Sequence, residues 1–155
     1  IQIDGIKLRG KIDRIDVNEK INAFDILDYK LGGSKPSFND LKKGISLQLP
    51  VYMYAARELL TKKLKKTYTP SEMFIYSLKY SSEEFGKKNV RSKGNKDDEI
   101  QNIDQLIQSS IGHIKSYITS ISEGKFHLSK LEERETKVCR FCEFRTVCRI
   151  DDKGN

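Results

Sequence analysis

The chain lacks the long apolar run that a membrane-spanning helix requires. No stretch of the 155 residues approaches the roughly 20 consecutive apolar residues that cross a bilayer. It also lacks a charged segment followed by an apolar one at its start, the pattern of a secretory signal peptide. We therefore expect a soluble, cytoplasmic protein. An internal repeat is absent as well, which excludes a repeat architecture.

Cysteine is scarce, and its three copies lie together. Cys139, Cys142 and Cys148 follow the spacing C-x₂-C-x₅-C. In a basic, apparently intracellular domain this cluster favours a metal centre over disulfides, and three is an odd count. A closed site needs four ligands, so the fourth is either His127, which would make a zinc site, or a cysteine outside this chain. Three reduced thiols that bind nothing are the remaining alternative.

The composition is that of one domain with a basic surface. A chain of 155 residues with 37% hydrophobic residues is long enough for one core, so we expect a single α/β unit. Lys and Arg number 29 against 22 Asp and Glu, a net charge of +7. This balance agrees with DNA as a partner, although solvated lysine-rich surfaces are also common. We expect residues 81–98 to be a mobile polar insert whose lysines touch DNA phosphates.

Hydrophobic periodicity predicts a mixed central β-sheet flanked by helices. Asp4 and Gly5 separate two short apolar runs, so we expect the domain to open as an antiparallel meander. The further predicted elements are strands over 7–17 and 24–30, a helix over about 41–60, a strand over 73–80, the polar insert, and a long amphipathic helix over 99–124. Isoleucines at three- and four-residue steps mark the core-facing side of the last helix.

Two acids and a lysine occur within this run of strand-forming residues. Alternation along 24–30 puts Asp28 and Lys30 on one face of a strand. The hairpin register that matches apolar residues pairs Val17 with Phe24, Ile15 with Ile26, and Asp13 with Asp28. Like charges opposite each other destabilise a sheet, so the two acids need a cation or ample water between them. The alternative is that each acid is solvated at an exposed hairpin end.

These residues resemble the core of a known nuclease superfamily. Asp13 followed by Asp28-Tyr29-Lys30 is similar to the motif of the PD-(D/E)XK nucleases, in the form of their RecB-type branch. The resemblance implies a restriction-endonuclease-like α/β fold and hydrolysis of DNA phosphodiester bonds. Asp13, Asp28 and the main-chain carbonyl of Tyr29 would hold Mg²⁺ or Mn²⁺. Lys30 would position the nucleophile or offset negative charge in the transition state.

A second motif supports the same branch. Gln48 and Tyr52 resemble the Gln-x-x-x-Tyr motif that follows the active-site strand, and their spacing puts them on one side of a helix. Residues 1–80 would thus form the catalytic sheet and the Gln-x-x-x-Tyr helix. Gln48 would orient the lysine or the DNA, and Tyr52 would support it. Pro50 predicts either a kink or a place in the first turns of this helix.

The cysteine segment 139–148 resembles AddB-type helicase-nuclease subunits and related CRISPR-associated nucleases. In those proteins three such cysteines and one that precedes the nuclease motifs hold a [4Fe-4S] cluster. By resemblance, Cys139, Cys142 and Cys148 are cluster ligands whose fourth partner lies outside the chain. The chain opens at Ile1, without Met, in a strand-like segment, so we interpret it as a piece of a larger protein.

The resemblance implies a role in double-strand break processing with a helicase-nuclease partner subunit. The alternatives are a catalytically silent DNA-binding or scaffold module, a CRISPR-associated RecB-type exonuclease, and a small metal-binding or redox protein centred on the cysteines. The resemblance implies that degenerate copies of such a domain usually lose one of the residues equivalent to Asp13, Asp28 and Lys30. All three are present here, which favours an active deoxyribonuclease.

Overall fold

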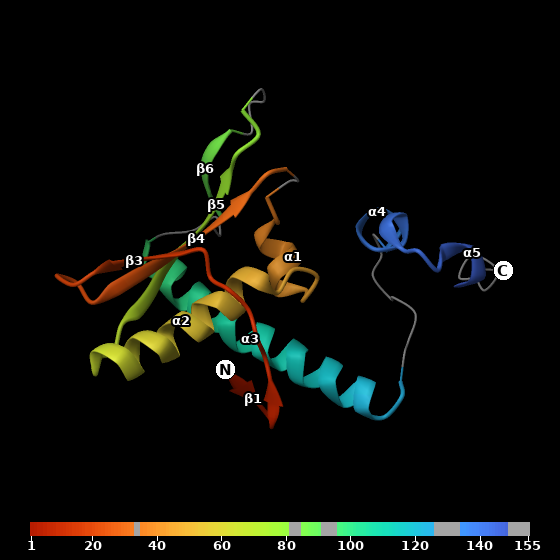
Figure 1. Cartoon of the computed structure of the whole chain (residues 1–155), viewed down its shortest axis with the longest axis horizontal. Helices are drawn as coiled ribbons and strands as arrows, with labels where there is room; N and C mark the ends of the chain where they lie inside the picture. Colours follow the sequence, from red (N-terminus) through yellow and green to blue (C-terminus); the bar gives the residue numbers. More distant parts are fainter. Residues whose placement is uncertain (33–34, 81–84, 91–95, 126–133, 149–155) are drawn as a thin grey trace. The chain divides into compact units, whose positions relative to one another are not determined.

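The computed structural model describes residues 1–32, 35–80, 85–90, 96–125 and 134–148, with the backbone alone for 96–102 and 137. Contacts divide the chain into two units, Ile1–Tyr117 and Ile118–Asn155, and each is considered by itself. The elements, labelled in Figure 1, are β1 (Gln2–Ile3), β2 (Ile6–Lys7), β3 (Arg14–Asn18), β4 (Ala23–Lys30), α1 (Phe38–Lys42), α2 (Gln48–Leu64), β5 (Thr69–Ser77), β6 (Gly86–Asn89), α3 (Lys96–Ser122), α4 (Arg134–Lys137), the 3₁₀ turn η1 (Cys139–Phe141) and α5 (Arg145–Cys148).

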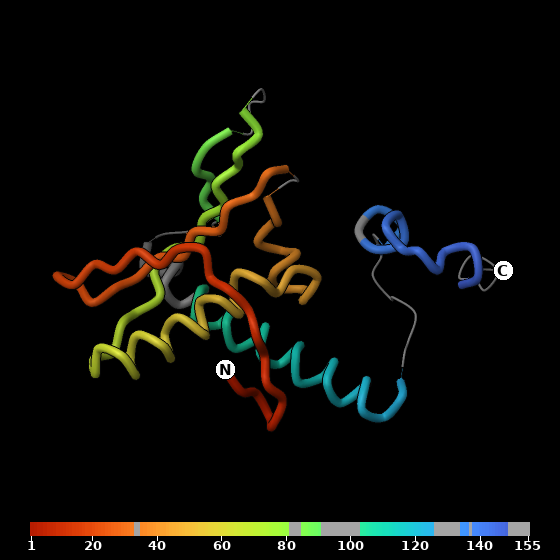
Figure 2. Tube along the Cα trace, in the orientation of Figure 1, coloured from red at the N-terminus to blue at the C-terminus, as the bar shows by residue number. Residues whose placement is uncertain are grey.

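Four strands form the central sheet in the order β3-β4-β5-β6. β4 is antiparallel to β3 and parallel to β5, and β6 is antiparallel to β5, so the sheet is mixed as predicted. The predicted hairpin register is confirmed, because Val17 pairs with Phe24 and Ile15 with Ile26. Figure 2 traces the connection from β4 through α1 and α2 to β5, the long crossover that a parallel pair requires.

The first two strands form a separate ribbon. Asp4 and Gly5 join β1 to β2 with φ angles of 46° and 80°, the left-handed values of a type I′ turn, so this hairpin is confirmed. β2 ends at Lys7 and does not pair with β3. The expected meander is therefore divided into this ribbon and the antiparallel pair β3–β4. Lys115 of α3 forms an ion pair of 3.0 Å with Asp4 and attaches the ribbon to the helix.

The single helix predicted over about 41–60 is instead the two helices α1 and α2. α1 begins with a capping box at Ser37. Gly44 then has a φ of +71°, and a Cβ at this position would lie 2.7 Å from the ring of His113. Only glycine combines this left-handed conformation with so close an approach, so the chain turns here. α2 starts at Gln48, which places Pro50 in its first turn, where the missing N–H costs no helical hydrogen bond.

A short polar strand lies inside the segment predicted to be a mobile insert. Residues Gly86–Asn89 form β6, and Val90 directly after it is 3% exposed. The prediction of an insert is therefore wrong for 86–90, while 81–84 and 91–95 lie outside the described residues. β5 begins at Thr69 rather than at residue 73, because pairing with β4 extends it through a β-bulge.

The hydrophobic core of the first unit lies between the sheet and helices α2 and α3. Its buried members include, from β4, β5, α2 and α3 in turn, Phe24, Ile26, Met73, Ile75, Leu49, Met53, Ile103, Leu106 and Ile107. The isoleucine stripe predicted on the last helix is confirmed as core at Ile103, Ile107 and Ile111. Even-numbered residues of β4 face this core, so the odd-numbered residues face the other side of the sheet.

The second unit contains the end of α3 followed by α4, η1 and α5. Arg145 and Glu135 form an ion pair of 2.7 Å within it.

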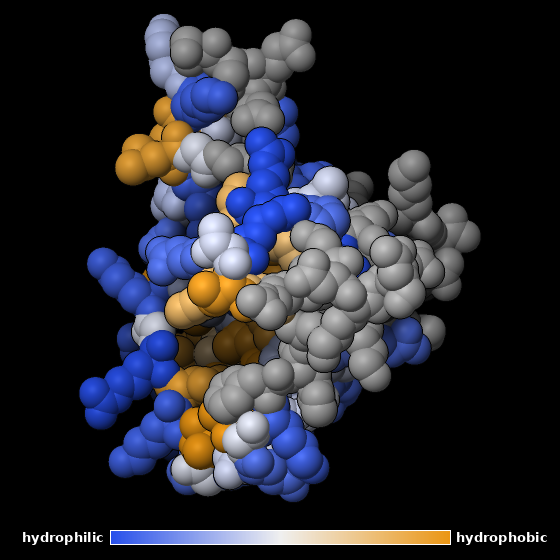
Figure 3. All heavy atoms as spheres, turned by 90° about the vertical axis from the view of Figure 1, so that its right-hand side faces the viewer, coloured by the Kyte–Doolittle hydropathy of each residue, from blue (hydrophilic) through white to orange (hydrophobic). Residues whose placement is uncertain are grey.

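Hydrophilic residues make up most of the coloured surface in Figure 3, with hydrophobic residues confined to limited areas. In the part of the chain that the structure describes, no helix has the length and apolarity needed to cross a membrane.

Candidate active site

Asp28 and Lys30 lie at the C-terminal end of β4 on its core-facing side. Asp28 is only 3% exposed, and carboxylates are rarely buried without a partner. Its Oδ2 lies 2.9 Å from Nζ of Lys30, so the ammonium group offsets the buried charge. The alternation of the strand therefore puts both groups in one place, as the sequence predicted.

Gln48 connects this pair to the first turn of α2. Its Nε2 donates a hydrogen bond of 3.1 Å to Oδ1 of Asp28, and its Oε1 accepts one of 2.9 Å from Nζ of Lys30. The amide thus turns its donor to the acid and its acceptor to the amine, which fixes its orientation. Each of the three side chains contacts the other two.

Tyr52 lies one helical turn after Gln48 and holds the amide from the other side. Nε2 of Gln48 donates a second hydrogen bond, of 3.2 Å, to the hydroxyl of Tyr52. The tyrosine ring lies against Gly10, where a Cβ would be 3.6 Å from Cε1 of the ring. The four-residue spacing puts both side chains on one side of α2, as predicted.

Asp13 reaches the same end of β4 from just before β3. Its Oδ2 accepts a hydrogen bond of 3.0 Å from the main-chain N–H of Tyr29. If the β3–β4 pairing continued, the N–H of Tyr29 would bond to the main chain of Ile12. β3 begins only at Arg14, so the Asp13 carboxylate accepts that hydrogen bond instead. This hydrogen bond fixes Asp13 beside Tyr29, which follows Asp28, in agreement with the predicted pairing of Asp13 and Asp28.

The buried carboxylate of Asp28 has a free position for a cation. Its Oδ2 has no hydrogen-bond donor among the described residues. Lys30 lies at ion-pair distance from that oxygen, but the hydrogen bond from its Nζ goes to Gln48. A buried, charged oxygen without a donor is costly, and a divalent cation would remove the cost.

The main-chain carbonyl of Tyr29 points toward the same place. The carbonyl of Lys30 accepts a hydrogen bond from the N–H of Leu78 on the β5 side. Successive residues of a strand alternate, so the carbonyl of Tyr29 points to the opposite side, where Asp13 lies. Carboxylate and carbonyl oxygens are ligands that Mg²⁺ accepts, and the predicted ligand set fits this cation. Nowhere in the described ranges do three or more His, Cys, Asp or Glu side chains gather into a metal-binding group.

Comparison with known proteins decides the family. A model of the PD-(D/E)XK nuclease superfamily matches residues 1–149 of the chain. The chain belongs to this superfamily. Its mixed sheet flanked by helices is the α/β core expected of a restriction-endonuclease-like nuclease domain.

The relatives of this PD-(D/E)XK domain include the B subunits of bacterial ATP-dependent helicase/deoxyribonucleases. That of Carboxydothermus hydrogenoformans is 26% identical over 98% of this chain and 19% of its own length. That of Alkaliphilus metalliredigens is 23% identical over 95% of this chain and 17% of its own length. The chain therefore spans less than a fifth of these relatives. No solved structure matches it.

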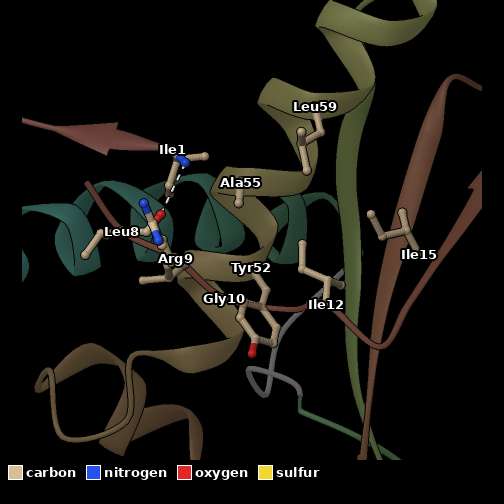
Figure 4. Close-up of a pocket in the computed structure, with 10 residues that line it drawn as sticks. Ile1, Leu8, Arg9, Gly10, Ile12, Ile15, Tyr52, Ala55 and Leu59 are labelled. Carbon is tan, nitrogen blue, oxygen red and sulfur yellow. Dashed lines mark hydrogen bonds between the residues drawn. The ribbon is translucent and has the colours of Figure 1, made fainter. Parts of the chain in front are cut away.

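An apolar cavity of about 660 Å³ lies beside Tyr52 in this PD-(D/E)XK domain (Figure 4). It is lined by Ile1, Leu8, Arg9, Gly10, Ile12, Ile15, Val51, Tyr52, Ala55 and Leu59. Figure 4 shows the hydroxyl of Tyr52 pointing away from the side chain of Leu59. Asp13, Asp28 and Lys30 are not among the lining residues, and Arg9 is the one charged residue in that list.

Two further charged groups of the sheet lie on the face opposite the core. Arg14 forms an ion pair of 2.6 Å with Asp16, and hydrogen bonds to Asp16 and then to Tyr29 raise the pKa of the guanidinium. Burial raises the pKa of Asp25, whose Oδ1 accepts a hydrogen bond of 3.0 Å from the N–H of Glu72 at the β-bulge. Sequence reasoning missed the contact between Arg14 and Tyr29, because it joins residues of two strands.

The three cysteines are free thiols in the second unit. Cys139 is buried, Cys148 is half-buried and Cys142 is exposed. Partial burial, followed by the charge of Glu135, raises the pKa of the Cys139 thiol. They do not form a metal-binding group in the described residues, and His127 lies outside those residues. A [4Fe-4S] cluster needs four ligands, and these cysteines supply three. The iron-sulfur assignment therefore stays a prediction.

Gln48 provides a test of this network. We predict that Gln48→Leu lowers the free energy of unfolding by about 1–3 kcal/mol, because the buried Oδ1 of Asp28 loses its donor. Urea unfolding followed by circular dichroism measures the change. Tyr52→Phe is the matched control, since it removes one hydrogen bond and leaves the donor to Oδ1 of Asp28 in place. Equal stability of Gln48→Leu and the unchanged chain would contradict the role given to Gln48.

Proposed function

We propose that this domain hydrolyses phosphodiester bonds of DNA with the help of Mg²⁺ or Mn²⁺. The observation that carries the proposal is the closed network of Asp28, Lys30 and Gln48, with Asp13 fixed beside it. If the acids were merely solvated, their carboxylates would be exposed, whereas Asp28 is only 3% exposed. The membership of the chain in a nuclease superfamily supports the same conclusion.

The metal would be held by Asp13, Asp28 and the carbonyl of Tyr29. When bound, it lowers the pKa of a coordinated water and neutralises charge that develops on the phosphate. Lys30 carries its ammonium to this point and positions the attacking water or offsets negative charge in the transition state. Gln48 keeps that ammonium in place through its 2.9 Å hydrogen bond, and Tyr52 fixes the amide of Gln48.

We further propose that the domain works within a helicase-nuclease that processes double-strand breaks. The support is the name of the relatives, B subunits of an ATP-dependent helicase/deoxyribonuclease, which implies a further partner chain and a DNA substrate. The net charge of +7 suits a polyanionic substrate, and bacterial DNA would place this work in the cytoplasm. A CRISPR-associated exonuclease and a silent DNA-binding or scaffold module are the alternatives that the assay below separates.

Cleavage of linear DNA by the full-length parent protein, in the presence of Mg²⁺, tests the proposal. We predict that Asp28→Ala and Lys30→Ala each lower the rate by about 100-fold or more, since each removes charge stabilisation at the reacting phosphate. The matched control is Asp104→Ala, which removes a carboxylate paired with Arg57 at 2.8 Å between α2 and α3. Cleavage that survives both site substitutions would disprove the assignment. DNA binding without any cleavage by the unchanged protein would favour the silent module.

We also infer that Cys139, Cys142 and Cys148 hold a [4Fe-4S] cluster together with a cysteine outside this chain. The C-x₂-C-x₅-C spacing supports this inference. The parent protein, prepared without oxygen, should contain about four iron atoms per chain and absorb in the visible range. Replacing all three cysteines with alanine should remove the iron. Iron that persists after this replacement would contradict the assignment.

A further inference from the structure

We propose that four aromatic side chains at the end of β4 that carries the carboxylates, on the opposite face of the sheet, form a platform on which unpaired bases of a single DNA strand stack. These are Tyr29, Tyr76, Phe85 and Tyr80, here called the aromatic row. The proposal deepens the proposed nuclease function and rests on it for the identity of the ligand. It adds the path by which the strand approaches the site.

The row crosses the face of the sheet opposite the core. Tyr29 of β4 pairs in register with Tyr76 of β5, and their ring centroids are 5.7 Å apart. Tyr76 meets Phe85 edge-on at 6.1 Å, and Phe85 meets Tyr80 edge-on at 5.7 Å. Each ring therefore contacts the next, and the four rings form a continuous series from β4 to the connection between β5 and β6.

The rings are too exposed for a purely internal packing role. Tyr80 is 87% exposed, Phe85 46% and Tyr29 39%. Single exposed aromatic residues are ordinary, but a contiguous group of them at the end of a sheet is a surface that favours stacking partners. Every base offers a π-face, so such a surface binds single strands with little regard to sequence.

A lysine lies beside the row where phosphates of a stacked strand would pass. Nζ of Lys87 lies 3.5 Å from the centroid of the Phe74 ring, and Lys87 pairs in register with Tyr76. At the other end, the charge of Arg14 is offset by its 2.6 Å ion pair with Asp16. Exposed rings with a cation beside them are the combination that single-strand binding surfaces use.

The row ends at the strand end that carries the proposed site of hydrolysis, on the other face of the sheet. The side chain of Tyr29 belongs to the row, while its main-chain N–H bonds to Asp13 and its neighbours in sequence are Asp28 and Lys30. Toward the other end of the same sheet face lies Asp25, a carboxylate that does not attract phosphates. Bases on the row would therefore hold the strand at the catalytic end of β4 and not along the whole sheet.

A tryptophan in the row gives a direct test, because the chain contains no other tryptophan. The 155-residue chain with Phe85→Trp is titrated with oligothymidine in EDTA, so that no metal-dependent cleavage occurs. We expect saturable quenching of the tryptophan emission by stacked bases. An abasic oligonucleotide of the same length should quench little. Absence of quenching by oligothymidine, or equal quenching by the abasic strand, would overturn the proposal.

Binding affinities of variants complete the test. The double variant Tyr80→Ala, Phe85→Ala should bind fluorescein-labelled oligothymidine about tenfold more weakly or worse, because it loses two stacking surfaces. Its affinity for the abasic strand should not change, and the pair Tyr80→Phe, Phe85→Tyr should retain normal binding. If the rings only stabilised the fold, the alanine variant would lose thermal stability and weaken binding to both strands equally, which would also overturn the proposal.

The variant Asp28→Ala separates this proposal from the proposed nuclease activity. It should lower cleavage by about 100-fold or more, while its binding of oligothymidine in EDTA should still weaken about tenfold when Tyr80→Ala and Phe85→Ala are added. Row-dependent binding without any cleavage by the unchanged protein would reject the nuclease activity and keep the base-stacking surface. Cleavage that depends on Asp28, with binding that does not depend on Tyr80 and Phe85, would reject the surface and keep the nuclease.

Discussion

The carboxylates of Asp13 and Asp28 at one end of the β3–β4 hairpin are the constraint on which the site depends, because like charges there need compensation. The β3–β4 register brings both acids to one end of the hairpin, and Asp28 is buried there. Lys30 offsets part of the charge, yet one oxygen of Asp28 keeps no hydrogen-bond donor among the described residues. A sheet tolerates such an arrangement only where a cation or water compensates it. This end of the hairpin therefore has room for a cation beside Lys30, the role that the proposed function gives to a divalent metal.

The helices fix the groups around the acids. The turn at Gly44, packed under His113 of α3, decides where α2 begins, and α2 begins with Gln48. The amide of Gln48 can therefore contact Asp28 and Lys30 at once. The proposed catalytic groups are thus held by a rigid helix start rather than by a loop, as a precise site requires. Packing far from the acids consequently determines their geometry.

Local patterns predicted the hairpin and the site more accurately than the connections. Apolar alternation located the pairing of Ile15 with Ile26, because one register alone buries that face. The break at Gly44 was missed, since its cause is His113 in a distant helix. β6 was missed because the polar sequence Gly86–Asn89 forms a strand only through pairing with β5. The aromatic row likewise depends on contacts between strands that no single segment reveals.

Thermal unfolding of the 155-residue chain with and without Mg²⁺ tests the central claim most directly, with Asp13→Asn as the comparison. Asparagine keeps the acceptor for the N–H of Tyr29 but removes the like charge. The account predicts that Asp13→Asn is at least as stable as the unchanged chain in EDTA, and that Mg²⁺ raises the melting temperature of the unchanged chain alone. Equal shifts by Mg²⁺ in both proteins, at matched ionic strength, would contradict it.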